Sequence, residues 1–468
     1  MQRFSFIPFK SFICERGRRL TRKRHDFLLK NHNYFPPEGH VSVSFNTETT
    51  ADIFYFGGAR RTEGASWSSE NQLFHLTLSV EDDDVNITDL RTPSLRGASL
   101  PPLQSPGFCG KSCEQLILWG GFNTLEVCTV NDLFLFEKIS SSRYKISVFK
   151  DPKEQCEFSF LKPVNELKRQ LGQVPRSRTG HTLTLLSDTE FAVMHGGIQL
   201  DQRYSPAISK TFSQICDDGS FYLLNTSTFT WQLLNLPEIA PRAYHSATYL
   251  PSTKSIVFIG GVSYLGRQPH HRISVTSPLI LYCDTQNDQF SLRTVSLSMC
   301  GLSPVYLSYH STCLLGDKIV VYGGFQQLQK EIEKGHCPSP SLQMLIIDLD
   351  QTDISSVLAP ANEFSTAGQT CASLGLREDC LLFSGGNKKH YFMYTSKPMI
   401  PSPCDLHDEC QIMESNEISP IAWIQCDKCT KWYHQFCVQL LGRVPRGKYF
   451  CKACQSTATS NRKKQKKT

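Results

Sequence analysis

Short apolar runs, each ending in a turn, recur along most of the chain. Six of them end in a glycine pair: "DIFYFGG" at Gly58, "LILWGG" at Gly121, "FAVMHGG" at Gly197, "IVFIGG" at Gly261, "IVVYGG" at Gly324 and "LLFSGG" at Gly386. The runs are rich in β-branched and aromatic residues and are bounded by Gly, Ser, Asn and Pro, which predicts strands. Hardly any amphipathic helical pattern precedes the C-terminal region. The sequence therefore predicts an all-β fold.

The glycine pairs are regularly spaced. From the first glycine of each pair to the next, the intervals are 63, 76, 64, 63 and 62 residues. A turn ending in histidine precedes three pairs: "RTGH" at His181, "RAYH" at His245 and "LSYH" at His310. Another apolar run follows five of the pairs: "NDLFLFE", "GSFYLLN", "SPLILYC", "LQMLIID" and "HYFMY". Such a period indicates a repeat architecture.

The recurring histidines fit a structural role better than a catalytic one. His181, His245 and His310 occupy the same phase of successive repeats, so we interpret them as hydrogen-bonding residues between strands. The chain has no complete phosphate-binding Gly-x-x-x-x-Gly-Lys-Ser/Thr loop and no Gly-x-Ser-x-Gly elbow. The repeat region is therefore predicted to be a binding platform without catalytic or cofactor-binding residues.

Composition is that of an ordinary folded protein. Of 468 residues, 40% are apolar and 20% are charged, and no apolar run approaches the ~18 residues that a membrane span needs. The N-terminus has no secretory signal pattern, so we expect a reducing compartment. The 19 cysteines are accordingly expected to be buried apolar residues or metal ligands, not disulfides; Cys109, Cys113, Cys371 and Cys380 lack metal-ligand spacing.

The two ends of the chain are basic. Residues 1–30 hold nine Lys and Arg against two acidic residues, and the tail from Arg462 to Lys467 holds five more with no acid. Such ends suit nuclear import or contact with nucleic acid phosphates. Two alternatives are that the ends are simply solvated, or that the Arg-rich start is a mitochondrial transit segment.

A dense set of metal-ligand residues lies near the C-terminus. In order they are Cys404, Cys410, Cys426, Cys429, His434, Cys437, Cys451 and Cys454. Zinc binds thiolate and imidazole tetrahedrally, so eight ligands predict two closed structural zinc sites per chain, without an open position for a catalytic water. His407 lies between the first two cysteines and could replace either as a ligand.

The glycine-pair repeats resemble the kelch family of β-propellers, in which each repeat forms one four-stranded blade. The resemblance covers about residues 45–396 and implies six blades. The longest loop, from Ile198 to Ser220, is expected to carry contacts, because loops on rigid scaffolds commonly do.

The order of the eight ligands, with histidine fifth, resembles the plant homeodomain (PHD) finger rather than a RING finger, which disfavours a ubiquitin ligase. This resemblance implies interleaved zinc sites, with Cys426 and Cys429 joined by Cys451 and Cys454, and the first pair joined by His434 and Cys437. It also implies that Trp423 and Trp432 form two walls of a methyl-lysine cage. Cation–π attraction explains the use of indole there. The alternative is that both tryptophans only pack the finger.

The PHD resemblance implies two further peptide contacts. Residues 421–425 would form the strand to which an extended histone tail adds. The bend from Val444 to Cys451 would offer backbone carbonyls to the amino terminus of the peptide.

The combination of kelch repeats and a PHD finger resembles the V(D)J recombination-activating protein 2-like family. "LPPLQSP" from Leu100 and "GQVPRSRTGHTLTLL" from Gly172 support it. The resemblance implies a nuclear, non-catalytic subunit that binds a recombinase or transposase, contacts DNA through that complex, and reads histone H3 trimethylated at lysine 4. The alternative is a general chromatin reader whose propeller recruits an unrelated complex.

Three departures favour a divergent or transposon-associated member. The join from Thr395 to Pro403 replaces the long acidic hinge, Met399 and Ile400 stand where a cage aromatic is expected, and Gln425 precedes the third ligand. They leave open the methylation-state preference and the choice between antigen-receptor recombination and transposition.

The predicted organisation has four parts. They are a basic extension over 1–44, the propeller over 45–396, the finger over 397–455 and a basic tail over 456–468.

Overall fold

The fold was analysed in a computed structural model of the chain. The structure describes residues 5–8, 39–47, 49–61, 67–69, 71–81, 84–126, 128–150, 173–187, 189–201, 213–215, 218–266, 268–287, 289–299, 305–328, 332, 338–341, 343–358, 369–373, 380–385, 391–395, 423–426, 432–434, 449–451 and 454.

The chain divides into two compact units. The repeat domain is Phe6–Thr395, and the C-terminal unit is Ser396–Thr468 together with Met1–Ser5. Strands dominate the described residues, in which the one named helical element is a short 3-10 turn at Pro251–Thr253. Among the described residues, no helix is long and apolar enough to cross a membrane. The all-β prediction is confirmed for the described residues.

Six larger sheets make up the repeat domain. Sheet 1 contains β2 (Val41–Asn46), β3 (Thr50–Phe56), β6 (Leu73–Glu81) and β7 (Asp84–Arg91). Sheet 2 contains β10 (Gly107–Ser112), β11 (Gln115–Trp119), β14 (Leu133–Ser140), β15 (Arg143–Phe149) and the parallel strand β8 (Ser94–Gly97). Sheet 3 contains β16 (Thr182–Leu185), β17 (Phe191–His195), β20 (Phe221–Asn225) and β21 (Thr230–Leu233).

The second half repeats this order. Sheet 4 contains β22 (Ser246–Leu250), β23 (Ser255–Ile259), β26 (Leu279–Asp284) and β27 (Gln289–Thr294). Sheet 5 contains β30 (Ser311–Leu315), β31 (Lys318–Tyr322), β34 (Gln343–Asp348), β35 (Asp353–Leu358) and the parallel strand β28 (Ser298–Met299). Sheet 6 contains β36 (Gln369–Ser373), β37 (Cys380–Gly385), β38 (Tyr391–Thr395) and β1 (Ser5–Pro8).

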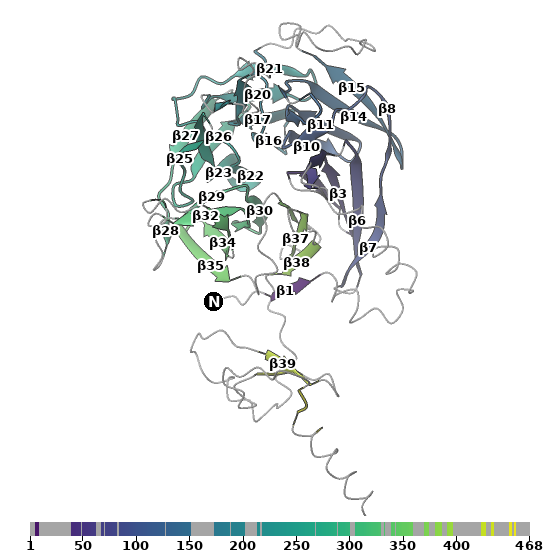
Figure 1. Ribbon diagram of the computed structural model, residues 1–468, viewed down its shortest axis with the longest axis vertical. Helices are drawn as coiled ribbons and strands as arrows, with labels where there is room; N and C mark the ends of the chain where they lie inside the picture. The colour runs from purple at the N-terminus through teal and green to yellow at the C-terminus, as the bar shows by residue number, and fades with distance from the viewer. Residues whose placement is uncertain are drawn as a thin grey trace, which may run out of the picture. The chain divides into compact units, whose positions relative to one another are not determined.

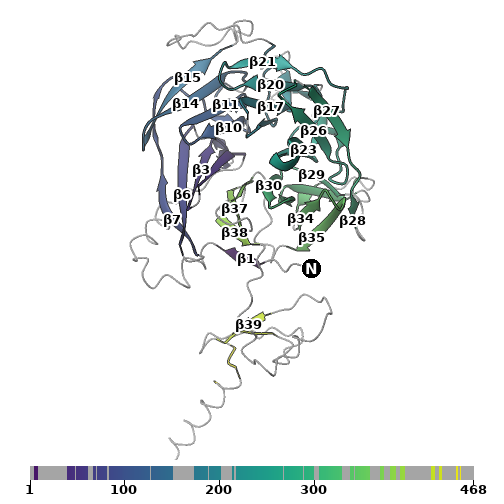
Figure 2. The same ribbon diagram turned by 180° about the vertical axis from the view of Figure 1, so that it is seen from behind.

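The sheets of the repeat domain follow one another around a common centre in chain order (Figures 1 and 2). One edge strand of each large sheet contacts an edge strand of the next, from β2 through β10, β16, β22 and β30 to β36. Strand β36 in turn contacts β2. The beginning and the end of the repeat region are therefore neighbours.

The hydrophobic core lies between consecutive sheets. One cluster joins Trp119 of sheet 2 to Met194 and Trp231 of sheet 3, and comparable clusters join sheets 1 and 2, 3 and 4, and 4 and 5. All five residues of β23 are buried. A sheet covered on both faces requires apolar residues at successive positions, which explains the unbroken apolar runs before the glycine pairs.

The glycine pairs fit against the next repeat. The N–H of the second glycine donates to a carbonyl of the following repeat in three equivalent bonds of 2.8 Å: Gly121 to Arg178, Gly197 to Arg242 and Gly261 to Leu307. At Gly260, where φ is +61°, an added Cβ would lie 2.6 Å from the Leu307 oxygen and 2.9 Å from Cε1 of His310. A side chain there would collide with the histidine of the next repeat, so this site requires glycine.

The recurring histidines hydrogen-bond between sheets. Nε2 of His245 lies 3.1 Å from Oγ1 of Thr182, and Nε2 of His310 lies 2.9 Å from Oγ of Ser246. Thr182 directly follows His181, and Ser246 directly follows His245. Each histidine therefore contacts the residue after the histidine of the previous repeat. The ring of His181 packs edge-on against Trp119, with ring centroids 4.9 Å apart. The structural interpretation is therefore confirmed for His245 and His310.

A chain of backbone hydrogen bonds links the residues that precede the histidine position in five repeats. The bonds run from Ser105 N to Gly39 O (3.0 Å), Gly180 N to Ser105 O (3.0 Å), Tyr244 N to Gly180 O (2.8 Å) and Tyr309 N to Tyr244 O (2.9 Å). All five residues have positive φ, between 47° and 73°. The rings of Tyr244 and Tyr309 stack with centroids 3.9 Å apart. The first five repeats are thus joined to one another by the same backbone contact.

Two features of sheet 6 were not expected from the sequence. Strand β1, from the segment predicted to be a basic extension, lies beside β38. Cys313 of β30 and Cys371 of β36 form a disulfide, so the expectation that no cysteines are paired is wrong here. Composition and compartment gave no sign of it, because the pairing depends on two residues 58 positions apart meeting across a sheet interface.

Candidate functional site

The C-terminal unit presents a short hairpin. Strand β39 (Trp423–Gln425) pairs antiparallel with β40 (Trp432–His434), with Trp423 opposite His434 and Gln425 opposite Trp432. Strand β39 lies within the segment 421–425 that was predicted to be extended. The hairpin therefore holds both predicted cage tryptophans on paired strands.

Three cysteines meet beside the hairpin. The Sγ atoms of Cys426, Cys451 and Cys454 lie within 4.8 Å of one another, although 25 residues separate the first two. Cys426 and Cys451 are buried, and the N–H of Cys451 donates to Sγ of Cys426 at 3.2 Å. A thiolate that accepts a backbone N–H is a usual arrangement around structural zinc. The donors fit a zinc ion, which would hold together segments distant in sequence.

The other predicted ligands lie partly outside the described residues. Cys404, Cys410, Cys429, Cys437 and His407 are outside them, so their positions remain predictions. His434 is described as the last residue of β40. The structure thus brings together three of the four cysteines expected to share one zinc ion.

In the repeat domain, the long loop of repeat 3 joins that of repeat 4. Strands β18 (Gln199–Asp201) and β19 (Ser213–Ile215) form a hairpin, and β19 pairs with β24 (Val262–Gly266), which pairs with β25 (Gln268–Arg272). We call this four-stranded sheet the loop sheet. It contains part of the loop that was expected to carry contacts.

Other small sheets are built from equivalent connections. They are β4 (Ala59–Arg61) with β5 (Trp67–Ser69); β9 (Leu103–Gln104) with β12 (Phe122–Asn123) and β13 (Cys128–Thr129); and β29 (Val305–Ser308) with β32 (Phe325–Leu328) and β33 (Ser339–Pro340).

A buried ion pair fixes the base of the long loop. The guanidinium of Arg178, fully buried, donates from NH2 to Oδ2 of Asp218 at 2.6 Å and from NH1 to the Gly196 carbonyl at 3.0 Å. Asp218 also accepts from the N–H of Ser220 at 2.8 Å. Burial raises the pKa of Asp218, but the charge and hydrogen bond of Arg178 outweigh it and bring the pKa to about 2. The carboxylate is therefore ionised at neutral pH and holds the loop end against the glycine pair.

Sequence reasoning missed this pair. Arg178 was noted only as the start of the "RTGH" turn, and Asp218 lies 40 residues later. One sequence feature could have indicated it: an arginine stands three residues before the histidine in two repeats, at Arg178 and Arg242.

The histidines between the sheets are uncharged at neutral pH. Burial lowers the pKa of His181 and His195 to about 3 and that of His310 to about 4, and it lowers the pKa of His245 well below the ordinary value. Their hydroxyl and ring contacts, together with this burial, fit packing rather than proton transfer.

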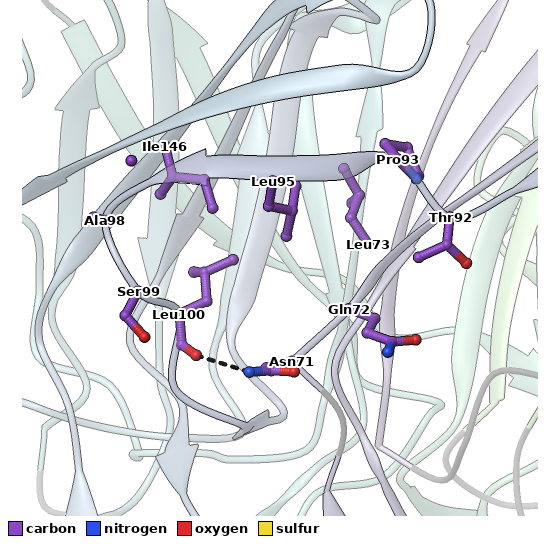
Figure 3. A pocket seen from close by; sticks show the side chains of 11 residues that line it. Asn71, Gln72, Leu73, Thr92, Pro93, Leu95, Ala98, Ser99, Leu100 and Ile146 are labelled. Atoms are coloured by element: carbon purple, nitrogen blue, oxygen red, sulfur yellow. Dashed lines mark hydrogen bonds between the residues drawn. The ribbon is translucent and has the colours of Figure 1, made fainter.

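A pocket of about 440 Å³ lies beside β8 and β15 (Figure 3). Its lining residues are Asn71, Gln72, Leu73, Thr92, Pro93, Leu95, Gly97, Ala98, Ser99, Leu100 and Ile146. Nδ2 of Asn71 donates to the carbonyl of Leu100 at 3.2 Å across one side of it. None of the lining residues is titratable, so the pocket offers no acid–base pair.

Comparison with known proteins gives one family-model match to a part of the chain and matches to solved structures. The PHD-finger family model matches residues 409–454, a span that includes seven of the eight predicted ligands and begins after Cys404 and His407. No curated relative matches the chain in sequence.

Two solved structures are similar to the chain. One, "Structure of YjhT", has 13% identity and a TM-score of 0.49, and the match covers 76% of this chain and 93% of that one. The other, "Cryo-EM structure of RAG in complex with one melted RSS and one unmelted RSS", has 15% identity and a TM-score of 0.47, and the match covers 78% of this chain and 96% of that one.

Proposed function

We propose that this chain is a nuclear, non-catalytic subunit of a DNA recombinase or transposase complex and that its finger reads histone H3 trimethylated at lysine 4. The observation that carries the reader function is the PHD-finger match over 409–454, with a cysteine cluster and a strand hairpin inside it. Catalysis and most DNA contact are assigned to the partner. This chain would place the complex on modified chromatin.

The register of the hairpin supports the methyl-lysine cage. Residues at alternate positions of a strand belong to the same face, and directly opposed residues of an antiparallel pair share a face. Trp423 is opposed to His434, and Trp432 is opposed to Gln425. The two tryptophans therefore occupy diagonal positions of one face, on adjacent strands. Trimethylammonium is held by indole faces without a hydrogen-bond acceptor, which distinguishes it from an unmodified lysine.

We propose two zinc ions for the finger. Cys426, Cys451 and Cys454 would hold one together with Cys429, and the cluster of sulfurs supports this set. His434 and Cys437 would hold the other together with Cys404 and Cys410, unless His407 replaces one of these two cysteines. Zinc supplies no catalysis here; it stabilises the fold of a unit too small for a large core.

We propose that the repeat domain is a closed, six-bladed kelch-type propeller. The support is a contact repeated around the domain. Nε2 of His40, in repeat 1, lies 2.8 Å from Oγ1 of Thr370, in repeat 6. This is the same histidine-to-hydroxyl contact that joins repeats 3 and 4 and repeats 4 and 5. The hydrogen bond between the first and last repeats thus belongs to the same repeated set as the bonds between neighbouring repeats.

The loop sheet is the proposed platform for the catalytic subunit. It joins two repeats, and the Arg178–Asp218 pair holds the base of its longest connection in one position. A rigidly based loop loses little conformational entropy on binding. The identity of the partner as a recombinase rests on the resemblance of the kelch and PHD combination and its quoted sequence fragments.

Affinity purification of the full-length chain from nuclear extract tests the proposal. We expect a transposase-like protein with acidic catalytic residues to co-purify. A matched variant, Trp432→Ala, should retain this partner and lose enrichment of nucleosomes trimethylated at lysine 4 of H3. The control variant Tyr433→Leu changes the neighbouring position, opposite Ile424, and should retain both.

The adaptor alternative predicts another result. If the recovered partners belong to an unrelated chromatin complex and no recombinase is found, the reader function stands and the recombinase function is wrong. If nucleosome enrichment is the same for Trp432→Ala and the unmodified chain, the cage assignment is wrong.

A further inference from the structure

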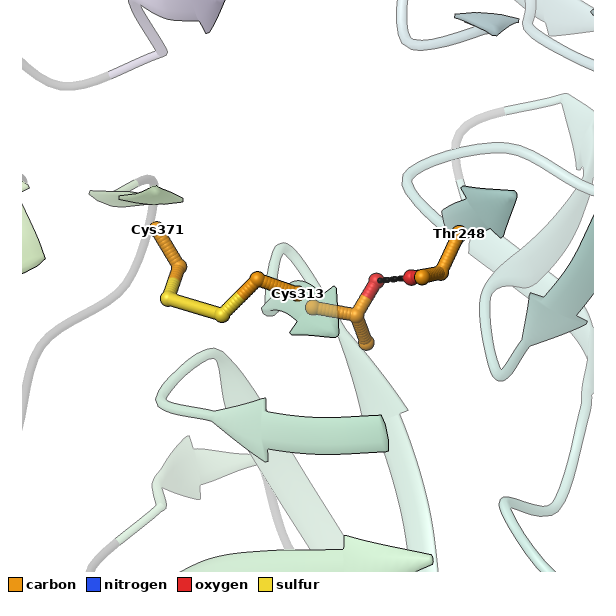
Figure 4. Close-up of a disulfide and its surroundings, with 4 residues drawn as sticks. Thr248, Cys313 and Cys371 are labelled. Carbon is orange, nitrogen blue, oxygen red and sulfur yellow. Dashed lines mark hydrogen bonds between the residues drawn. A yellow bond between two sulfur atoms is a disulfide. The ribbon is translucent and has the colours of Figure 1, made fainter. Parts of the chain in front are cut away.

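The Cys313–Cys371 disulfide replaces a hydrogen bond of the repeat. At the interface of sheets 4 and 5, Oγ1 of Thr248 donates to Oγ1 of Thr312 at 2.8 Å. Thr248 is the third residue after His245, and Thr312 is the second after His310. Cys313 is the third residue after His310, and Cys371 directly follows Thr370, the hydroxyl partner of His40. The cysteines therefore occupy the two threonine positions, one interface further along (Figure 4).

The two sulfurs differ in access to solvent. Cys313 is buried, with 8% of its surface exposed, whereas Cys371 is half-buried. The Cα atoms are 6.0 Å apart, within the range that a disulfide spans without backbone movement. The bond can thus form or break while both strands keep their places, with small thiols reaching it at Cys371.

We propose that Cys313 and Cys371 form a reversible redox latch between sheets 5 and 6, oxidised by glutathione disulfide and reduced by glutathione. Disulfides in reducing compartments are chiefly transient or redox-sensing, and the proposed nuclear setting is of that kind. The inference goes beyond the proposed function, because the latch belongs to the repeat domain whatever that domain binds.

Oxidation proceeds by two thiol–disulfide exchanges. The Cys371 thiolate attacks one sulfur of glutathione disulfide, forming a mixed disulfide and releasing one glutathione thiolate, which takes up a proton. The Cys313 thiolate then attacks the Cys371 sulfur and releases the second glutathione. Two protein thiols and one glutathione disulfide thus become one protein disulfide and two glutathione molecules. Reduction is the reverse sequence.

The latch acts on the sheet that closes the repeat domain. Sheet 6 combines β1 from the start of the chain with β36, β37 and β38 from its end, and His40–Thr370 joins it to repeat 1. The residue after β38, Ser396, begins the C-terminal unit. A cross-link over 58 residues restricts the opened chain, so reduction should ease local opening of sheet 6.

Peptide mapping of the full-length chain, kept in zinc-containing buffers of graded glutathione to glutathione disulfide ratio, tests the latch. We expect a linked Cys313–Cys371 peptide in oxidising buffer that is lost in reducing buffer under native conditions. Hydrogen exchange in β36 should become about 30-fold faster or more on reduction, while exchange in β22, which has the Thr248–Thr312 contact, should not change.

Two variants complete the test. The double variant Cys313→Thr with Cys371→Thr copies the neighbouring interface and should fold with β36 exchange independent of redox state. The control Cys283→Ser, in sheet 4, should keep the wild-type redox response. Absence of the linked peptide at every ratio, resistance of the link to glutathione, or equal β36 exchange in both states would overturn the proposal; the wild-type measurements decide even if a variant fails to fold.

Discussion

The repeat domain and the finger are stabilised in opposite ways. In the repeat domain, one set of contacts recurs: a glycine N–H to the carbonyl of the next repeat, a histidine to a hydroxyl of the previous one, and an apolar cluster between sheets. In the finger, the sulfurs of Cys426, Cys451 and Cys454 bring together residues from the middle and the end of the module. Loss of one contact should therefore cost little in the repeat domain, where many equivalent contacts remain. Loss of one metal ligand should unfold the finger.

The contrast follows from size. Long chains bury a larger fraction of their surface, and sheets 2, 3 and 4 of the repeat domain each contribute two apolar faces. A module of about 50 residues buries too little surface, so metal binding supplies most of its folding free energy. The proposed functions follow the same division, with a broad platform in one unit and a compact reader in the other.

The largest expected effect comes from removing a finger ligand. Cys451→Ser should unfold the finger, because its Sγ contributes to the cysteine cluster and its N–H bonds to Cys426. We expect zinc content to fall below two ions per chain and hydrogen exchange of β39 to become unprotected, with β23 unchanged. Loss of protection in β23 would show that the two units do not differ as described.

The next effect is breakage of the Arg178–Asp218 pair. Arg178→Gln should destabilise the repeat domain by about 3 kcal/mol, since it removes a buried guanidinium and leaves the half-buried Asp218 carboxylate without its partner. The double variant Arg178→Met with Asp218→Leu should recover part of this loss, because no charge remains buried. Chemical denaturation with an intrinsic fluorescence signal measures both. Equal losses in the two variants would indicate a packing role without a charge contribution.

Acid should weaken the repeat domain through its buried histidines. Their folded pKa values lie near 3 to 4, below the value of about 6.5 in the unfolded chain, so the unfolded chain binds more protons between these limits. The contribution of these histidines to the free energy of unfolding is fully present above pH 6.5 and declines as the pH falls from 6.5 toward their folded pKa values. Each histidine should lower the free energy of unfolding by about 2 kcal/mol at pH 5.

Hydrogen exchange of β23 against pH isolates this effect from acid release of zinc. His310→Gln keeps a hydrogen-bonding group near Ser246 but does not titrate. The stability of this variant should therefore fall less with decreasing pH, by the contribution of one histidine. An unchanged pH profile in this variant would contradict the assignment.

The smallest effect concerns one inter-sheet hydrogen bond. Ser246→Ala removes the hydroxyl partner of His310 and should cost about 1 kcal/mol, because a single buried bond contributes little and the repeat is held by many others. Thermal unfolding should show a shift of a few degrees at most. A loss comparable to that of Arg178→Gln would mean that the repeated contacts are not independent.

Much of the fold was predictable from local pattern. The glycine pairs, apolar runs and histidine turns are short-range signals, and they correctly indicated strands and inter-strand histidines such as His245. The pairing of β1 with β38, the joining of β19 to β24, the Arg178–Asp218 pair and the Cys313–Cys371 bond all depend on distant segments meeting. Sequence periodicity reports the conformation of a segment but not its partner, so these features were not predicted.

The finger shows the opposite balance. The resemblance of the ligand order to the PHD finger implied that Cys426, Cys451 and Cys454 share a site, and the structure brings their sulfurs together. The choice of two ligands among Cys404, His407 and Cys410 was not predictable, since all three have suitable donors.

Calorimetric titration of the full-length chain with histone H3 tail peptides tests the central claim most directly. The account predicts that the peptide trimethylated at lysine 4 binds with a micromolar dissociation constant, about −7 to −8 kcal/mol, and that the unmodified peptide binds more weakly. Trp432→Ala should remove most of this preference with zinc content unchanged, and Trp423→Ala should remove part of it. Equal affinity for both peptides, or tighter binding of the unmodified one, would contradict the account.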